Sequence, residues 1–234
     1  MIPKNKVVLI TGAAGTLGKA VAAAFAADNA QLVLLDVSEA ALQAAYPGSD
    51  PRRLLVAADL TDDASTQQAV QQARQRFGRI DALCNIAGGF RMGPAVHETS
   101  AELWQQMLDM NAHTLLNAVR AVVPGMLEQG NGRIVNVGAG AGQKGLQQMG
   151  AYSASKSVVI RLTESMAAEL RERGINVNCV LPGIIDTPPN RAAMPKADFA
   201  KWVAPADLAG VIRFLCSDAA RAIHGAAIPV TGLS

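Results

Sequence analysis

The feature that most restricts how this chain can fold is the regular alternation of short apolar runs with longer helical patterns. The predicted strands are Val7–Ile10, Gln31–Asp36, Arg53–Ala57, Ala82–Asn85, Arg133–Val137, Ile175–Leu181 and Ala226–Val230. The predicted helices between them are Gly15–Asp28, Ser38–Ala45, Ala64–Phe77, Ala101–Glu128, Ala151–Arg173 and Asp207–Ser217. Continuous apolar strands separated by helices indicate a parallel sheet covered on both faces. The pattern therefore predicts a doubly wound α/β fold with three layers, α/β/α.

The length and composition of the chain indicate a single domain. With 234 residues, of which 50% are hydrophobic, the chain can bury one large core. The sequence shows no linker, repeat or low-complexity segment, so we assign residues 1–234 to one domain. In a fold of this kind, ligands lie beyond the carboxyl ends of the strands.

The first predicted strand runs directly into a glycine-rich turn, Thr11-Gly12-Ala13-Ala14-Gly15-Thr16-Leu17-Gly18, which opens the first helix. Glycines here permit a tight turn, close approach of the backbone to a pyrophosphate, and close packing of helix on strand. Phosphates then lie at the helix N-terminus, where free amides and the helix dipole meet them. This context predicts a Rossmann-like dinucleotide-binding fold. The predicted cofactor contacts in the turn are Gly12, Gly15, Thr16, Leu17 and Gly18.

Asp36, at the end of the second predicted strand, indicates which dinucleotide binds. Its carboxylate is placed to accept hydrogen bonds from the adenosine ribose hydroxyls and to repel a 2′-phosphate. No Arg or Lys stands beside it or in the glycine turn to attract that phosphate. We therefore predict NAD(H) in preference to NADP(H). The alternative, that Asp36 caps the helix starting near Ser38, is less favoured because Ser38 is itself a better cap.

The ends of the next two strands supply further candidate contacts. Asp59 and Leu60 follow the third strand, where the adenine would lie, and Thr61 is placed to cap the next helix. The fourth strand ends in Cys84-Asn85-Ile86-Ala87-Gly88-Gly89, where small residues let a cofactor approach the backbone; the alternative is a simple turn. From this run we take Asn85, Ala87 and Gly88 as cofactor-binding candidates.

Asn111 is an unusual residue within the predicted helix Ala101–Glu128, because its neighbours are mostly apolar. Asn is a mediocre helix former and is costly to bury without a partner. We expect Asn111 either to satisfy a break in the helix backbone or to order a water near a site.

Tyr152 and Lys156 form a Tyr-x-x-x-Lys motif on the first turns of the predicted helix Ala151–Arg173. Residues four apart lie on one helical face, about 5–6 Å apart at Cβ. An ammonium held there stabilises the tyrosinate, so we expect a lowered phenol pKa and a usable general acid/base. The alternative is an ordinary amphipathic helix that happens to carry one Tyr and one Lys.

These motifs occur in one order along the chain and lead to Pro182-Gly183-Ile184-Ile185-Asp186-Thr187, and together they resemble the short-chain dehydrogenase/reductase family from end to end. The resemblance implies hydride transfer between nicotinamide C4 and a small organic substrate, with Tyr152 passing a proton to or from the substrate oxygen. It also implies that Lys156 binds the nicotinamide ribose and lowers the Tyr152 pKa, and that Asn111 holds a water of the proton relay. The backbone at Ile185 and the Thr187 hydroxyl would hold the carboxamide. The cofactor-binding residues implied in this last segment are Pro182, Gly183, Ile185 and Thr187.

Two features depart from the usual family pattern. The glycines fall at Gly12, Gly15 and Gly18, a spacing similar to that of the extended members and the dihydropteridine reductases. The position of the family's catalytic Ser is occupied by Ala139, and the run Val137–Gly142 contains no hydroxyl. Loss of one such donor typically costs about 10²–10³ in rate.

Ala139 leads to three functional hypotheses. Dihydropteridine reductases have the same Ala, keep Tyr and Lys, and have a loop similar to Asp186–Trp202, so we favour reduction of a quinonoid, pterin-type substrate. The first alternative is a carbonyl/alcohol oxidoreductase similar to a 3-oxoacyl reductase, in which a water or Gln143 replaces the Ser. The second is a catalytically silent NAD-binding sensor or scaffold. The retained Tyr152, Lys156 and Asn111 count against the silent protein.

The segment at about residues 187–204 lies where the resemblance places a substrate lid. Met194, Phe199 and Trp202 are candidates for an apolar wall, and Asn190 and Arg191 for a polar edge. The alternative is a surface loop that packs its own apolar residues. The predicted substrate contacts, here and elsewhere, are Phe90, Gln143, Met149, Asn190, Met194 and Trp202.

Composition excludes several other classes. A net charge of +2 with dispersed Lys and Arg gives no nucleic-acid footprint, and no apolar run approaches a membrane span. The start of the chain leads into a strand without a secretory leader, so we expect a cytoplasmic protein. Cys84, Cys179 and Cys216 lie in apolar segments, which favours buried free thiols over disulfides or a metal site. The family resemblance implies a homodimer or homotetramer formed through the two long helices and the last strand.

Overall fold

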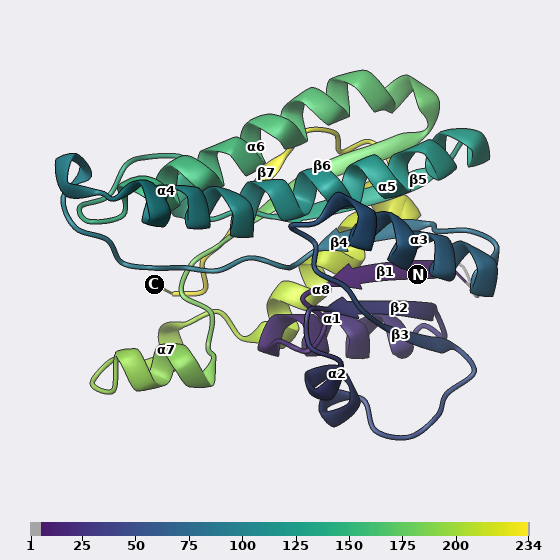
Figure 1. Cartoon of the computed structure of the whole chain (residues 1–234), viewed down its shortest axis with the longest axis horizontal. Helices are drawn as coiled ribbons and strands as arrows, with labels where there is room; N and C mark the ends of the chain where they lie inside the picture. Colours follow the sequence, from purple (N-terminus) through teal and green to yellow (C-terminus); the bar gives the residue numbers. More distant parts are fainter. Residues whose placement is uncertain (1–5, 234) are drawn as a thin grey trace.

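The computed structural model describes residues 6–233, which form one α/β domain around a parallel sheet. The strands are β1 (Val7–Thr11), β2 (Gln31–Asp36), β3 (Arg53–Ala57), β4 (Ala82–Asn85), β5 (Gly132–Val137), β6 (Ile175–Pro182) and β7 (Ala227–Val230). They pair in the order β3-β2-β1-β4-β5-β6-β7, and every pair is parallel (Figure 1). The predicted doubly wound fold is therefore confirmed.

Helices cover both faces of the sheet. The helices are α1 (Thr16–Ala26), α2 (Glu39–Ala45), α3 (Asp63–Phe77), α4 (Ala101–Leu108), α5 (Thr114–Gln129), α6 (Gly150–Leu170), α7 (Pro188–Ala193) and α8 (Pro205–Leu215). Side chains of β1 alternate between the two layers. Val8 and Ile10 join the core under α1, α2 and α8, whereas Val7 and Leu9 join the core under α3, α5 and α6. Because both faces of the strands are buried, they read in sequence as continuous apolar runs.

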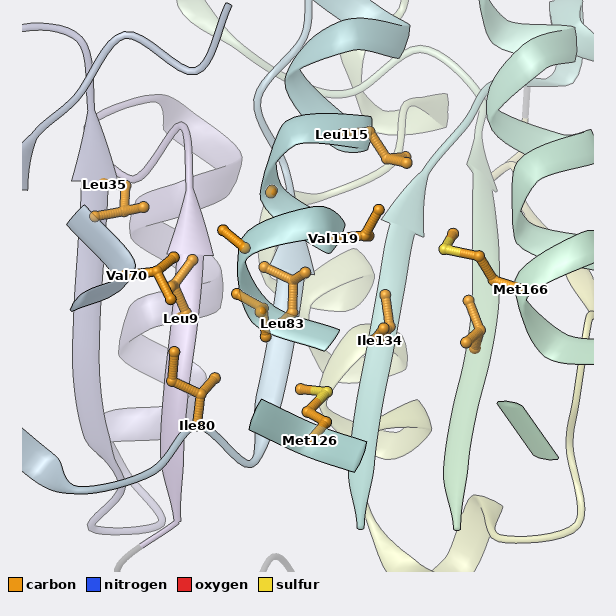
Figure 2. Packing of buried hydrophobic residues seen from close by; sticks show 14 of the residues in the cluster. Leu9, Leu35, Val70, Ile80, Leu83, Leu115, Val119, Met126, Ile134 and Met166 are labelled. Carbon is orange, nitrogen blue, oxygen red and sulfur yellow. The ribbon is translucent and has the colours of Figure 1, made fainter. Parts of the chain in front are cut away.

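Figure 2 shows the second of these cores at close range. Leu83 and Ile134 project from neighbouring strands toward Val119 of α5, and Leu9 lies beside Val70 of α3. All five side chains are almost fully buried. This packing fixes α5, and with it the turn that precedes α5, against the carboxyl half of the sheet.

Two local sequence predictions were wrong. The stretch Ala101–Glu128 is not a single α-helix, because a π-helical turn, Asp109–His113, separates α4 from α5. Thr61 does not cap α3; the carboxylate of Asp62 accepts hydrogen bonds from the amides of Ala64 and Ser65 instead. The predicted Ser38 cap of α2 is confirmed by its bond from the Ala41 amide.

The cysteines are free and buried, as predicted. Cys84 of β4 and Cys216, next to the end of α8, lie with their Sγ atoms 4.0 Å apart in the core below α8. Cys179 lies within β6.

The strand order reverses at β1, which is paired with β2 on one side and with β4 on the other. Successive connections therefore leave the carboxyl edge in opposite directions at this point, which is where doubly wound folds bind their ligands. The ends of β1, β4, β5 and β6 place Thr11, Asn85, Val137 and Pro182 along one edge of the sheet. The predicted site residues follow these strand ends.

Candidate active site

The glycine turn has the geometry that its sequence predicts. Gly12 has φ +62°, a conformation that L side chains rarely adopt. A Cβ at Gly18 would lie 2.2 Å from the Gly12 carbonyl oxygen, so only glycine lets α1 pack this closely on the turn. Gly15 precedes α1 and has no side chain to cap the amides of Thr16 and Leu17. The turn thus presents amides without a capping acceptor at a helix N-terminus, an arrangement that favours the binding of an anion.

Asp36 lies at the end of β2 and touches the same turn. Its Oδ2 accepts a hydrogen bond from the Ala14 amide at 3.0 Å, and the Ala13 amide bonds the Leu35 carbonyl. The residue is half-buried, so its carboxylate also remains accessible. Asp36 therefore both fixes the turn and presents a negative charge at the position predicted for the adenosine ribose.

Asp59 is already engaged within its own turn. Its Oδ1 accepts hydrogen bonds from the Thr61 amide at 2.9 Å and the Thr61 hydroxyl at 2.7 Å. These bonds stabilise the charged form and lower the pKa of Asp59 below its usual value. Leu60 is buried, and its carbonyl accepts from Asn117 of α5. The predicted adenine contact thus lies in a preformed turn that the protein stabilises by itself.

The turn after β4 is tied to the end of β1. The Thr11 hydroxyl accepts hydrogen bonds from the amides of Ile86 and Ala87, both at 3.0 Å. This role of Thr11 was not predicted from the sequence. The signal available is a hydroxyl residue that closes the strand just before the glycine turn.

Asn85 belongs to a buried chain of side chains that crosses from β4 to α6. Its Nδ2 donates to Asn136 Oδ1 at 2.9 Å, and Asn136 donates to the Thr163 hydroxyl at 2.8 Å. The Asn85 Oδ1 atom is buried without a partner within residues 6–233. The amide group thus joins two strands, while its oxygen can still accept a hydrogen bond.

Lys156 lies on α6, and its ammonium reaches the end of β5. Nζ donates to the Val137 carbonyl oxygen at 2.9 Å, and the side chain is buried. Burial disfavours the charged form and lowers the Lys156 pKa to about 8.

The Tyr152 phenol differs from its sequence-based expectation. Burial raises the Tyr152 pKa to about 12, instead of the predicted lowering. The shared helical face is real, but the Lys156 ammonium is drawn toward the Val137 carbonyl, and desolvation of the phenol dominates.

Asn111 closes the π-helical turn between α4 and α5. Its Oδ1 accepts from the Gly89 amide at 3.1 Å, and its Nδ2 donates to the carbonyls of Gly89 and Met107. Nδ2 also donates to the Ser155 hydroxyl at 3.2 Å. Of the two predicted roles, the structure shows the satisfied backbone break; the ordered water stays a prediction.

Gly88 marks the point where these groups converge. A Cβ at this position would lie 2.8 Å from Asn111 Oδ1 and 3.3 Å from Lys156 Nζ. Ser155, which the sequence analysis missed, is fully buried behind them and donates to the Tyr152 carbonyl at 2.8 Å. The available signal was a serine inside the predicted helix, three residues after Tyr152, where its hydroxyl can bond a carbonyl of the preceding turn.

Ala139 is buried in extended backbone just after β5, at the start of the turn Gly140–Gly142. That turn packs on α6, because the Ser157 hydroxyl donates to the Gly142 carbonyl at 2.7 Å. Gln143 follows it on the surface, and Met149 lies half-buried just before α6. Position 139, which lacks a hydroxyl, therefore belongs to an ordered turn that packs against α6.

Phe90 lies against Tyr152. The two ring centroids are 4.9 Å apart at an interplanar angle of 86°, an edge-to-face contact, and half of the Phe90 surface remains exposed. Phe90, a predicted substrate contact, thus lies in direct contact with the Tyr152 ring.

The predicted lid contains structure of its own. Thr187 caps α7 by accepting from the Asn190 amide, and Asn190 donates to the Ile185 carbonyl at 2.8 Å. Arg191 pairs with Asp186 and lies over the Phe199 ring, which in turn packs on Trp202.

These contacts favour the alternative of a loop that packs its own residues. Trp202 is only 7% exposed and Asn190 is bonded within the loop, whereas Met194 is exposed. The segment is anchored on the sheet side, because Val203 forms an isolated bridge with Ile185 and Gly183 bonds the Val230 carbonyl.

The sequence profile described as short chain dehydrogenase matches residues 6–198. A 3-oxoacyl-(acyl-carrier-protein) reductase of Thermotoga maritima is 36% identical, over 98% of this chain and 97% of its own length. The D-threitol dehydrogenase of Mycolicibacterium smegmatis is 36% identical, over 97% of this chain and 92% of its own. The crystal structure of an NAD⁺-bound xylitol dehydrogenase superposes with a TM-score of 0.90 and 28% identity, covering 98% of each chain.

These relatives give no support to the predicted likeness to dihydropteridine reductases, which rested on the glycine spacing, Ala139 and the Asp186–Trp202 loop. The profile match and the level of identity establish the family itself. The chain belongs to the short-chain dehydrogenase/reductase family of oxidoreductases, whose members act by hydride transfer.

Proposed function

We propose that the protein is an NAD(H)-dependent oxidoreductase that interconverts a carbonyl compound and its alcohol, with Tyr152 as the proton donor and acceptor. The observation that carries the proposal is the convergence of Lys156 Nζ and Asn111 Oδ1 on Gly88, beside the half-buried Tyr152 at the carboxyl edge of the sheet. Lys156 supplies a charged group and Asn111 a polar group. Gly88 lets the backbone come close to both, so that the groups that the reaction needs lie around one point.

The residues of the glycine turn fit a dinucleotide. The amides at the start of α1 would bind the pyrophosphate, and the Asp36 carboxylate would bind the ribose hydroxyls. The same charge disfavours a 2′-phosphate, which supports NAD(H) over NADP(H). The similarity to an NAD⁺-bound xylitol dehydrogenase agrees with this preference. When bound, the cofactor supplies or accepts the hydride.

The protein's own task is to move a proton at the Tyr152 phenol oxygen. During reduction the phenol donates its proton to the substrate oxygen, and during oxidation the tyrosinate takes that proton from the alcohol. Burial alone raises the Tyr152 pKa to about 12, so the tyrosinate needs a nearby positive charge. Lys156, whose pKa is about 8, is mostly protonated at neutral pH and supplies that charge from the same face of α6.

Ala139 removes one hydrogen-bond donor that the substrate oxygen would otherwise have. No side-chain hydroxyl at this position can hold the substrate oxygen, so we infer that Tyr152 is its principal donor. Phe90 adds an exposed apolar surface beside Tyr152 and favours a substrate with an apolar or flat portion next to the reacting carbon.

A substrate panel followed by NADH absorbance tests the proposal. We expect oxidation of NADH with at least one ketone or 3-oxo thioester, slower turnover with NADPH, and loss of activity in Tyr152→Phe. Turnover of quinonoid dihydropterin without any carbonyl reduction would overturn the proposed substrate class. Tight NADH binding with no turnover across ketone, quinone and pterin panels would instead show a silent binding protein.

A further inference from the structure

Tyr46 lies outside the residues assigned above but contacts the glycine turn directly. It follows the last residue of α2 and is 9% exposed. Its hydroxyl donates a hydrogen bond to the Ala13 carbonyl oxygen at 2.7 Å, across a sequence separation of 33 residues. Ala13 is the residue between Gly12 and Ala14 in the turn that faces the proposed dinucleotide.

The Ala13–Ala14 peptide unit is held at both of its polar ends. Its carbonyl accepts from Tyr46 Oη, and its N–H donates to Asp36 Oδ2 at 3.0 Å. A peptide unit is planar and rigid, so the direction of its carbonyl fixes the direction of its N–H. Tyr46 therefore sets the orientation of the group that binds one carboxylate oxygen of Asp36.

Tyr46 is itself fixed by Arg53 of β3. The Arg53 Nη2 atom donates to the carbonyls of Tyr46, Pro47 and Gly48, at 3.1, 3.1 and 2.7 Å, and the guanidinium carbon lies 5.6 Å from the centre of the Tyr46 ring. Burial raises the pKa of Tyr46 to about 12, so its hydroxyl stays a donor throughout the neutral range. The ring also borders a hollow of about 320 Å³ between α1, α2 and β3.

We propose that Tyr46 is a positioning residue for the adenosine half of the dinucleotide, acting through the Ala13–Ala14 peptide to hold Asp36 in its ribose-binding orientation. This inference rests on the proposed function. It assigns to Tyr46 an effect on cofactor binding, and none on the proton transfer at Tyr152.

The test compares Tyr46→Phe with the wild-type enzyme, using NADH and reduced nicotinamide mononucleotide, which lacks the adenosine half, as probes. Phe keeps the ring and removes the donor, so we expect the Kd for NADH to rise about three- to tenfold. The Kd for the mononucleotide and kcat at saturating NADH should change by less than about twofold, because neither depends on Asp36. Leu42→Ala is the control, since Leu42 is buried in α2 without bonding the turn; it should lower Tm and leave NADH affinity unchanged.

A double-mutant cycle tests the route through Asp36. In an Asp36→Ala background, Tyr46→Phe should weaken NADH binding by less than about twofold, because no carboxylate remains to be oriented. An equal loss in both backgrounds, or an equal loss for the mononucleotide, would overturn the inference. Wild-type affinity in Tyr46→Phe would remove the inference alone, whereas failure of the wild-type protein to bind NADH would overturn the proposed function as well.

Discussion

Burial sets the proton affinities of Tyr152 and Lys156 on α6. It raises the pKa of the Tyr152 phenol to about 12 and lowers the pKa of the Lys156 ammonium to about 8, because both charged forms lose hydration. The Tyr-x-x-x-Lys spacing predicts that the two side chains share a face but carries no information on desolvation, which depends on how the surrounding loops pack. The pKa of the phenol was for this reason not predictable from the sequence.

The Lys156 pKa predicts how stability depends on pH. Its folded value of about 8 lies below the ordinary 10.5, so between these values the unfolded chain binds more protons than the folded one. Stability therefore rises with pH across this window, by at most about 1.4 kcal/mol per pH unit. The difference in unfolding free energy between wild type and Lys156→Met, measured in urea at pH 7 to 10, should grow in favour of wild type above pH 8. A difference that stays constant with pH would contradict the buried, depressed lysine.

Ala139→Ser should restore a second donor to the substrate oxygen. If the missing hydroxyl limits carbonyl reduction, kcat should rise at least about tenfold, because one such donor is typically worth about 10²–10³ in rate. Steady-state kinetics with the best ketone from the substrate panel measures the effect. Ala141→Ser, in the same turn, is the matched control and should leave kcat unchanged. A fall in kcat for Ala139→Ser would show that the alanine itself shapes the site.

Asp36→Asn should change the preference between the two dinucleotides. The amide keeps an acceptor for the Ala14 N–H but removes the charge that opposes a 2′-phosphate. We expect the affinity ratio of NADPH to NADH to rise about tenfold or more, as measured by fluorescence titration. Glu39→Gln removes an exposed charge from the first turn of α2 and serves as the control. An unchanged ratio in Asp36→Asn would rule out the role given to this carboxylate.

At the scale of secondary structure, the strands were the most predictable elements and the break before α5 the least. Strands buried on both faces are continuous apolar runs, and their predicted ends differ from the observed ends by at most one residue. The apolar pattern is also continuous through Ala101–Glu128, so it predicts one helix. The π-helical turn forms because Asn111 bonds Gly89 and Ser155, and these contacts come from loops and helices that are distant in sequence.

Short α7 was missed for a different reason. Pro188 and Pro189 suggest a loop, yet proline is well accommodated in the first turn of a helix, and the Thr187 side chain supplies the cap. The combination of a capping threonine and two prolines is thus a usable start signal.

Asn111→Ala should damage both stability and activity. It leaves the Gly89 amide and the carbonyls of Gly89 and Met107 without their partner, so we expect a loss of about 2–4 kcal/mol in urea unfolding. Activity per folded molecule should also fall, because Gly89 adjoins the point where Lys156 and Asn111 converge. Asn117→Ala removes another buried asparagine, which bonds the Leu60 carbonyl, and should lower stability while leaving kcat unchanged. Equal kcat values in the two variants would show that Asn111 has no role in catalysis beyond its contribution to stability.

At the scale of the whole molecule, the strand order determines where the candidate site lies. The reversal of strand order at β1 puts the glycine turn, the turn after β4 and the start of α6 at one edge, which the alternating sequence pattern was sufficient to predict. Side-chain networks that cross the sheet, such as Asn85–Asn136–Thr163, were not predictable, since they join three elements that lie far apart in sequence. No helix within residues 6–233 is long and apolar enough to span a membrane.

We propose that copies of this chain associate through the outer faces of α4, α5 and α6. Trp104 of α4 and Leu116 of α5 are exposed there. Light scattering coupled to size exclusion should give a mass of two or four times 24.3 kDa, and Leu116→Glu should reduce it. Leu146→Glu, on an exposed loop, is the control and should leave the mass unchanged. A wild-type mass of 24.3 kDa at micromolar concentration would contradict this association.

The peptide between Ala13 and Ala14 also restricts how the coenzyme preference of this lineage can evolve. A first substitution of Asp36 by a residue without an acceptor would leave the Ala14 N–H unpaired. The carbonyl at the other end of the same peptide would still be held by Tyr46. Such a step weakens the binding of the original dinucleotide before the protein has gained any contact to the new one. Mutational paths through asparagine, or through a prior change in the glycine turn, avoid that intermediate. The rigidity that orients one carboxylate thus also limits the order in which neighbouring positions can change.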